Sequence, residues 1–223
     1  MKTIRFLLIT LLLSLLLSAA TQAKEEEKVT FSVGLLGTYN SIGSDFNGTT
    51  SYVSSDNGTT VYVPKVSAGS GLGLISLIKI PTLPYDCGIS YLTSSHSATW
   101  NAGAASGNVT YSLFNIDFYI PFMTQEKLAP YYVLGMSMCG LTVPNGSENN
   151  SAQTGDATFT GAGLNLGLGT EYFLLPKLAL RGETNFRFTM FSGVSGVGGV
   201  QGRITNIPTS SALDFSFGAT YYL

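Results

Sequence analysis

The chain has 223 residues, of which 11% are charged and 12% aromatic, with 26 glycines and a formal net charge of −2. Ordinary soluble domains carry about 25% charged residues, so this chain is unusually apolar for a protein that faces only water. Its near-neutral balance offers no basic surface, which excludes nucleic acid as a partner. Beyond the N-terminal segment no apolar run approaches the roughly 20 residues of a membrane-spanning helix, so a helical membrane protein is excluded as well.

The N-terminal segment predicts a secretory signal peptide. Two positive charges precede an apolar run over 6–17, and small residues follow it. The run is shorter than the roughly 20 residues of a spanning helix. We expect cleavage after Ala20 or Ala23, so that 1–23 is the removed signal peptide and 24–223 forms a single barrel domain exported from the cytoplasm.

Apolar and polar residues alternate with a period of two along the mature chain, which predicts β-strands. Over 178–190, for example, Leu and Phe alternate with Arg181, Glu183 and Arg187, so the three charges share one face and the other face carries none. The segments that show this alternation are 29–41, 66–80, 85–97, 114–122, 129–142, 160–172, 178–190 and 213–223.

The connections between these segments alternate in length. The long ones cover roughly 42–65, 98–108, 143–158 and 192–209, and the short ones 81–84, 123–128 and 174–177. All short turns therefore fall on the side that holds both termini, as in bacterial outer-membrane barrels with short periplasmic turns. The sequence predicts an all-β fold, an eight-stranded antiparallel up-and-down transmembrane β-barrel with both termini toward the periplasm.

A soluble barrel or sandwich is the alternative, because each strand taken alone fits either fold. A soluble protein, however, would have to present whole rows of Leu, Phe and Ile to water on the face opposite its charges. Lipid accepts such rows, and aromatic residues near the predicted strand ends suit the two lipid–water boundaries. We therefore expect the following residues to face outward: Leu164, Leu166, Leu168, Phe186, Phe188, Phe215 and Phe217.

The charges of the strands are expected to face the lumen and to pair there. The predicted network consists of Asp117, Glu171, Arg181, Glu183, Arg187 and Asp214. A tight turn at 174–177 places Glu171 opposite Arg181, and if Leu223 ends level with Leu178, Arg187 stands opposite Asp214. Asp117 and Glu183 lie at a similar height and are expected to share either arginine. Buried charges must find partners or lose their charge, and bidentate arginine–carboxylate contacts satisfy them best. The alternative is a water-lined lumen in which each group is separately hydrated.

Other reactive residues give no active site. Cys87 and Cys139 have no metal-site spacing. They could form a disulfide in an exported protein, but the predicted strands place them on non-neighbouring strands and at opposite ends, so we expect unpaired thiols. We predict neither a metal nor a cofactor. His96 lies between serines, as in a lipid hydrolase, but no acid follows nearby to orient its ring. We expect a solvated histidine at a loop edge and a protein that is not an enzyme.

Three segments resemble the OmpA-like, opacity-type family of small outer-membrane β-barrels. They are APYYVLG (129–135), GLNLGLGTEYF (163–173) and PKLALRGE (176–183). The resemblance covers essentially the whole mature chain and implies a polar, side-chain-filled interior in adhesins, structural proteins or minor channels. The chain departs from the family at Leu223, where members commonly end in Phe, the end of the strand read by the barrel-assembly machinery. We expect no peptidoglycan-binding domain after the barrel and therefore no role in anchoring the cell wall.

Together these patterns predict an integral protein of the bacterial outer membrane, structural or surface-binding (adhesin-like) through four extracellular loops. The expected partners are outer-membrane lipid, the barrel-assembly machinery through the C-terminal strand, and a surface ligand that the sequence does not name. We expect a monomer. A narrow, low-conductance porin is the alternative, although an eight-stranded barrel is only wide enough for its own side chains to fill.

Overall fold

The computed structural model describes residues 29–48, 52–54, 60–100, 105–123, 127–148, 154–197, 200–205 and 207–223. No helix within these ranges is long and apolar enough to cross a membrane. The signal peptide predicted over 1–23 lies outside the described residues and stays a prediction.

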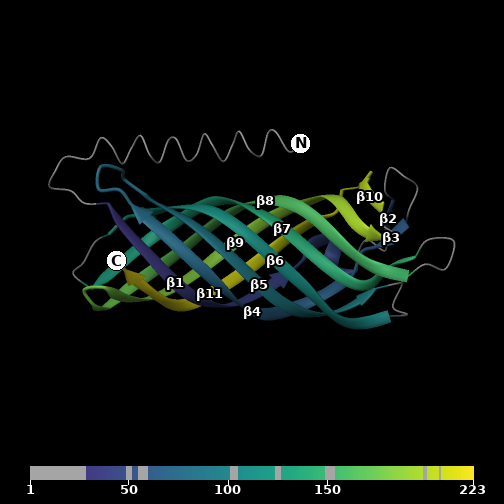
Figure 1. Cartoon of the computed structure of the whole chain (residues 1–223), viewed down its shortest axis with the longest axis horizontal. Coiled ribbons are helices and arrows are strands. Elements are labelled where there is room, and N and C mark those ends of the chain that lie inside the picture. Colours follow the sequence, from purple (N-terminus) through teal and green to yellow (C-terminus); the bar gives the residue numbers. More distant parts are fainter. Residues whose placement is uncertain are drawn as a thin grey trace.

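Eight long strands form a closed antiparallel barrel (Figure 1). They are β1 (Thr30–Ile42), β4 (Lys65–Lys79), β5 (Asp86–Trp100), β6 (Ala105–Pro121), β7 (Leu128–Glu148), β8 (Thr154–Leu175), β9 (Leu178–Val197) and β11 (Thr209–Tyr222). Each pairs with the next in this order, and β11 pairs back onto β1 from Ser32↔Tyr222 to Ile42↔Ala212. The last pairing leaves no free sheet edge, which confirms the predicted fold class.

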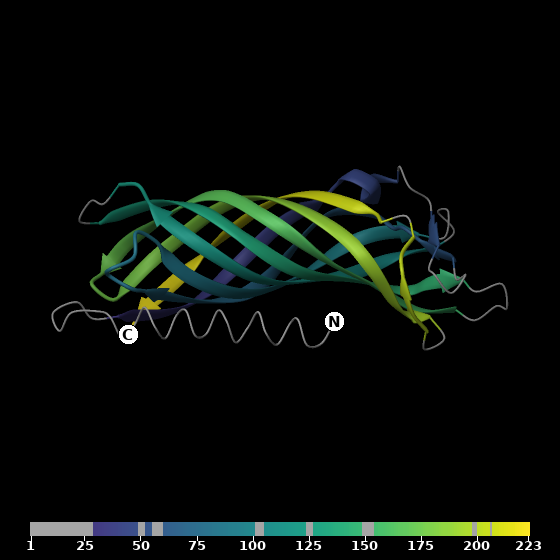
Figure 2. The same ribbon diagram turned by 90° about the horizontal axis from the view of Figure 1, so that it is seen from above.

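The first strand begins and the last strand ends on the same side of the barrel, as expected. The amide of Leu223 donates to the carbonyl of Phe31 at 2.9 Å. The short elements gather at the opposite end (Figure 2). They are the 3-10 helix η1 (Ser44–Asn47) and the strands β2 (Tyr52–Ser54), β3 (Thr60–Tyr62) and β10 (Val200–Arg203).

The strands are longer at the outer end than the sequence pattern indicated. The connections expected over 98–108 and 143–158 are largely strand, because β5 and β6 pair out to Trp100↔Ala105 and β7 and β8 pair out to Glu148↔Thr154. These outer halves carry Ser, Thr and Asn on their outward face, a composition that reads as loop in a sequence.

The outward face is apolar over the membrane-spanning part. The seven residues expected to face outward are between 43% and 63% exposed, whereas Arg181 and Arg187 are 1% exposed. A soluble barrel would show the reverse pattern, so the lipid-facing assignment is confirmed.

The barrel is taller than the lipid layer that it crosses. β8 has 22 residues, and at about 3.3 Å per residue and a tilt of about 40° such a strand rises roughly 55 Å. The apolar band of an outer-membrane barrel is about 25 Å tall. On β5 the apolar outward residues end at Tyr91, and Thr93, Ser95 and Ser97 follow outward above it. The outer part of the wall therefore stands beyond the acyl chains.

Candidate functional site

Arg181 lies in the lumen of the periplasmic half and holds two carboxylates. Its Nη1 atom is 3.1 Å from Oε1 of Glu171, and its Nη2 atom is 2.9 Å from Oε2 of Glu183. Glu171 faces Arg181 directly across β8 and β9. The guanidinium carbon also lies 4.4 Å from the centroid of the Tyr119 ring and 4.6 Å from that of the Tyr131 ring, and the two rings meet edge to face. Two carboxylates and two rings thus surround this buried cation. Its Nε atom is buried and has no hydrogen-bond partner in the described part of the chain.

Three neutral side chains complete this lower part of the network. The Tyr131 hydroxyl donates to Oε2 of Glu183 at 3.2 Å, and the side-chain amide of Asn185 donates to Oε1 of the same residue. The Tyr222 hydroxyl donates to Oε2 of Glu171. In the sequence Tyr222 breaks the alternation of the last strand. Its inward hydrogen bond explains why an aromatic residue stands at an inward position there.

Arg187 holds a second set of partners farther from the periplasm. Its Nε atom donates to Oδ1 of Asn165 at 2.8 Å, its Nη1 atom contacts Oδ2 of Asp214, and its Nη2 atom is 3.4 Å from Oδ1 of Asn115. The register expected between the last two strands, β9 and β11, is wrong by two residues. Asp214 pairs with Asn185, because Tyr221 and not Leu223 is level with Leu178. The long arginine side chain therefore reaches its carboxylate diagonally.

Asp117 does not share either arginine, contrary to the expectation from its height. No ion pair of Asp117 occurs among the described residues. Its Oδ1 atom instead accepts a hydrogen bond from the Asn165 amide at 2.9 Å, and its Oδ2 atom lies 3.5 Å from the Tyr119 hydroxyl. Because Asn165 also binds Arg187 and Tyr119 stacks on Arg181, Asp117 joins the two parts into one continuous network.

Glycines on the inward face of β8 make room for these side chains. A Cβ atom at Gly169 would lie 2.4 Å from the Tyr131 ring, and one at Gly167 would lie 1.8 Å from Oδ1 of Asn185. Both approaches are far inside van der Waals contact. The Gly-rich strand is therefore a packing requirement of the network on the neighbouring strands.

The outer half of the lumen contains a large apolar cluster beside polar residues such as His96 and Asn40, whereas the family resemblance implied a polar interior. The buried residues of this half include Leu113, Leu141, Val143, Phe159 and Phe191. Phe46 of η1 folds over them and is fully buried, with its ring centroid 4.9 Å from that of Phe191 and 6.0 Å from that of Phe159. A hydrophobic layer thus lies across this part of the lumen.

A hydrogen-bonded carboxylate ties this cap to the wall. An Oδ atom of Asp45 accepts from the backbone amide of Thr209 at 2.7 Å and from its hydroxyl at 3.1 Å. The Gly43 amide donates to the carbonyl of Ser211 at 2.9 Å. These contacts fix η1 to the start of β11.

His96 is buried in the lumen and is not the solvated loop-edge residue that the sequence suggested. The reason is that β5 continues to Trp100, so His96 is an inward residue within a strand, 1% exposed. Its Nδ1 atom donates to the carbonyl of Ser67 at 2.8 Å, so in the neutral ring Nε2 accepts from the Ser94 hydroxyl at 2.9 Å. Cys87 and Cys139 are free, as expected. No group of three His, Cys, Asp or Glu residues that could hold a metal occurs in the described parts of the chain.

The profile of the family described as "Outer membrane protein beta-barrel domain" matches residues 9–221. The chain belongs to this family. It is therefore a bacterial outer-membrane β-barrel whose outer face contacts lipid. With the barrel's termini in the periplasm, as in such barrels, η1 and the cap of the lumen lie on the extracellular side.

Solved structures of other outer-membrane proteins share the family's barrel. Neisserial surface protein A is 16% identical with a TM-score of 0.52, and the match covers 86% of this chain and 96% of that one. OprG from Pseudomonas aeruginosa is 13% identical with a TM-score of 0.53, covering 88% and 97%. AlkL is 12% identical with a TM-score of 0.53, covering 91% and 93%. At these identities the likeness shows the fold alone. A comparison with curated proteins gave no match.

Proposed function

We propose that this protein is a closed, non-conducting barrel that serves the outer membrane as a structural or surface-binding protein through its extracellular end. The observation that carries the proposal is the doubly filled lumen. Arg181 and Arg187 with their carboxylates occupy the lower part, and the Phe46 cluster occupies the upper part. The six charged residues predicted from the sequence act in this account as the plug of the lower lumen.

The free-energy cost of opening the filled lumen to solutes follows from its ion pairs. Separating one partner from a buried ion pair costs about 3–5 kcal/mol. At about 4 kcal/mol, a state with one broken pair is populated roughly once in a thousand molecules. Two arginines and an aromatic cap would have to move together to open a continuous path, so the open state is rarer still.

The extracellular end provides the binding surface in this proposal. The β7–β8 hairpin is the longest of the barrel and pairs out to Glu148↔Thr154, and β3 lies against it through Val61↔Ser147. Neisserial surface protein A, which shares the fold, is named for a surface location, and we extend that location to this chain. We further propose that the protein acts as a monomer and enters the membrane through recognition of its C-terminal strand by the barrel-assembly machinery.

We propose no catalytic role. Ser94 and His96 form a hydrogen-bonded pair, but both side chains are buried, with at most 3% of either residue exposed. No carboxylate of the described residues is hydrogen-bonded to the histidine ring. The ring's other nitrogen is occupied by a backbone carbonyl, so the pair lacks both an orienting acid and access for a substrate.

A narrow channel is the second candidate, and one observation favours it. Asn40 on β1 and Asp214 on β11 carry buried polar atoms. Nδ2 and Oδ1 of Asn40 and Oδ1 of Asp214 have no hydrogen-bond partner in the described part of the chain. These two residues face each other across the strands. Buried polar groups of this kind commonly hold water, so a hydrated seam would run along this wall.

Two measurements test the proposal. Proteoliposomes with the purified protein should not swell in solutions of small sugars, whereas a narrow channel would let them swell. Cells that display the protein should bind host-surface preparations or abiotic surfaces more strongly than cells without it. Removing residues 145–155 should abolish that gain while leaving the protein in the membrane. Swelling together with unchanged surface binding would overturn the proposal.

A further inference from the structure

A bulge in β4 shapes the outer wall above the lipid layer. Val66 pairs with Ala98 and Gly69 pairs with His96, so the two residues at 67 and 68 stand opposite one residue of β5. The Ser67 hydroxyl donates to the Ser97 carbonyl at 2.9 Å, and the Ser67 carbonyl accepts from the His96 ring at 2.8 Å. The bulge is thus held by one hydrogen bond on the outside of the barrel and one in the lumen. Bulges of this kind occur often beside functional sites.

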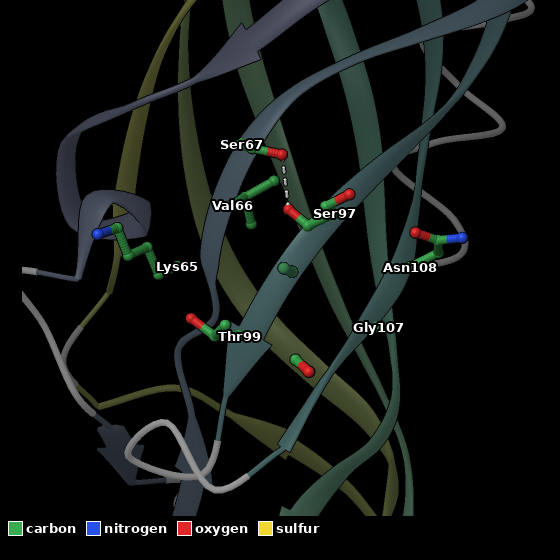
Figure 3. Close-up of a pocket in the computed structure, with 9 residues that line it drawn as sticks. Lys65, Val66, Ser67, Ser97, Thr99, Gly107 and Asn108 are labelled. Carbon is green, nitrogen blue, oxygen red and sulfur yellow. Dashed lines mark hydrogen bonds between the residues drawn. The ribbon is translucent and has the colours of Figure 1, made fainter.

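A groove of about 530 Å³ lies on the outside of the barrel beside this bulge (Figure 3). Hydroxyl and amide side chains dominate its lining, with Ser67 from β4, Ser97 and Thr99 from β5, and Asn108 from β6. Figure 3 places Lys65 at the margin, with its amino group directed toward η1. Of the nine described residues that line the groove, Lys65 alone is charged and none is acidic. The groove therefore offers hydrogen-bonding groups and one positive charge.

The height of the groove on the barrel wall indicates which part of the membrane lies beside it. Tyr91 is the last apolar outward residue of β5, and Ser97 lies six positions farther along the same face. At about 3.3 Å per residue and a tilt of about 40°, this is a rise of roughly 15 Å. The polar layer of a phospholipid bilayer is only about 5–8 Å thick on each side. The groove is thus above the acyl chains and above phospholipid headgroups, at a level that only a lipid with a larger headgroup reaches.

We propose that this groove binds the phosphorylated sugar headgroup of a glycolipid in the outer leaflet. Sugar hydroxyls both donate and accept hydrogen bonds, which the hydroxyl and amide side chains of the groove can match. Lys65 lies at the margin with its amino group toward η1, and a rotation of this long, flexible side chain would bring the ammonium to a phosphate on the headgroup, which no carboxylate in the lining repels. A ligand anchored in the membrane approaches the groove from below, along the lipid-facing wall, and the open side of the groove accepts it. The inference concerns the outer wall and does not depend on whether the lumen conducts.

The test uses the full mature protein in detergent micelles with rough lipopolysaccharide as the probe, and native mass spectrometry gives the dissociation constant. Asn108→Trp fills the groove from an exposed strand position and should weaken binding by about tenfold, the effect of losing one or two good contacts. Thr160→Trp is the matched control, because Thr160 is also an exposed outward residue, on β8. It should leave the constant within about twofold. Lys65→Gln should weaken binding of the phosphorylated glycolipid by about threefold and leave binding of the dephosphorylated form unchanged.

Folding of each variant is checked by its heat-modifiable migration in gel electrophoresis, and Ser97→Leu replaces any tryptophan variant that does not fold. Equal dissociation constants for Asn108→Trp, Thr160→Trp and the parent protein would overturn the proposed site. Free core oligosaccharide that binds as tightly as the intact glycolipid would overturn the membrane source of the ligand. Binding of phosphatidylglycerol in place of the glycolipid would overturn the sugar assignment.

Discussion

Replacing Arg181 with methionine removes the charge at the centre of the lower network while keeping much of the side-chain volume. Glu171 and Glu183, which each lie within 3.1 Å of the guanidinium, would then remain buried without their cation. Breaking a buried ion pair in this way costs about 3–5 kcal/mol, and each lost ring contact adds about 0.5–2 kcal/mol. We expect the free energy of unfolding to fall by about 5 kcal/mol.

Urea unfolding in phospholipid vesicles measures this loss. The chain has one tryptophan, Trp100, which is 6% exposed in the folded barrel, so its fluorescence reports the unfolding of the whole wall. The triple variant Arg181→Met, Glu171→Gln, Glu183→Gln removes the unpaired charges and should regain at least about half of the lost stability. Lys177→Met in the turn between β8 and β9 is the control, since Lys177 is exposed, and should change stability by less than about 1 kcal/mol.

Two results would refute this reasoning. A loss below about 1 kcal/mol for Arg181→Met would mean that the carboxylates are hydrated and need no cation. A triple variant no more stable than the single variant would mean that the loss came from packing and not from uncompensated charge.

Three further predictions use the same unfolding assay. Tyr222→Phe should cost about 1–3 kcal/mol because it removes a hydrogen bond to the buried carboxylate of Glu171; an unchanged midpoint would speak against this bond. Gly169→Val should prevent folding, since its Cβ would lie 2.4 Å from a ring, whereas the outward Gly182→Val, whose nearest neighbour is 4.0 Å away, should fold; equal behaviour of the two would disprove the packing argument. Leu166→Arg should cost about 2–4 kcal/mol on the lipid face, while Ser97→Arg, outward on β5 above the last apolar residue Tyr91, should cost less than about 1 kcal/mol; equal losses would contradict the assigned lipid boundary.

The lipid-facing side and the pairing of Glu171 with Arg181 could be read from the sequence because alternation assigns each residue to a face. A tight turn between β8 and β9 then leaves little freedom in register. The register between β9 and β11 could not be read in the same way. No short turn connects these strands, and nothing in the sequence shows that Tyr221 is level with Leu178.

The outer half of the barrel escaped prediction for a physical reason. There the strands turn apolar residues such as Val109 and Leu141 inward and hydroxyl side chains outward. This reverses the polarity of the lower half, and the mixture of Ser, Thr, Asn and Gly reads as loop. The burial of His96 was missed for the same reason. Its strand was expected to end at residue 97, one residue beyond His96, whereas β5 continues to Trp100.

The neutral members of the network were missed because an amide or a phenol at an inward position carries no signal of its own. Asn115 and Asn165 occupy the inward positions of their strands, as do the charged residues beside them. Once a lumen contains two arginines and four carboxylates, inward Asn and Tyr residues are the groups that can satisfy the remaining donors and acceptors. That rule would have identified both asparagines.

Single-channel conductance of the purified protein in planar bilayers tests the filled lumen most directly. The parent protein should show no steady current, and the triple variant Arg181→Ala, Arg187→Ala, Phe46→Ala, which removes both arginines of the lower lumen and the aromatic cap, should show discrete openings. Each single variant should remain closed because the other layer still seals the lumen. A steady current through the parent protein, unchanged in the triple variant, would contradict the account.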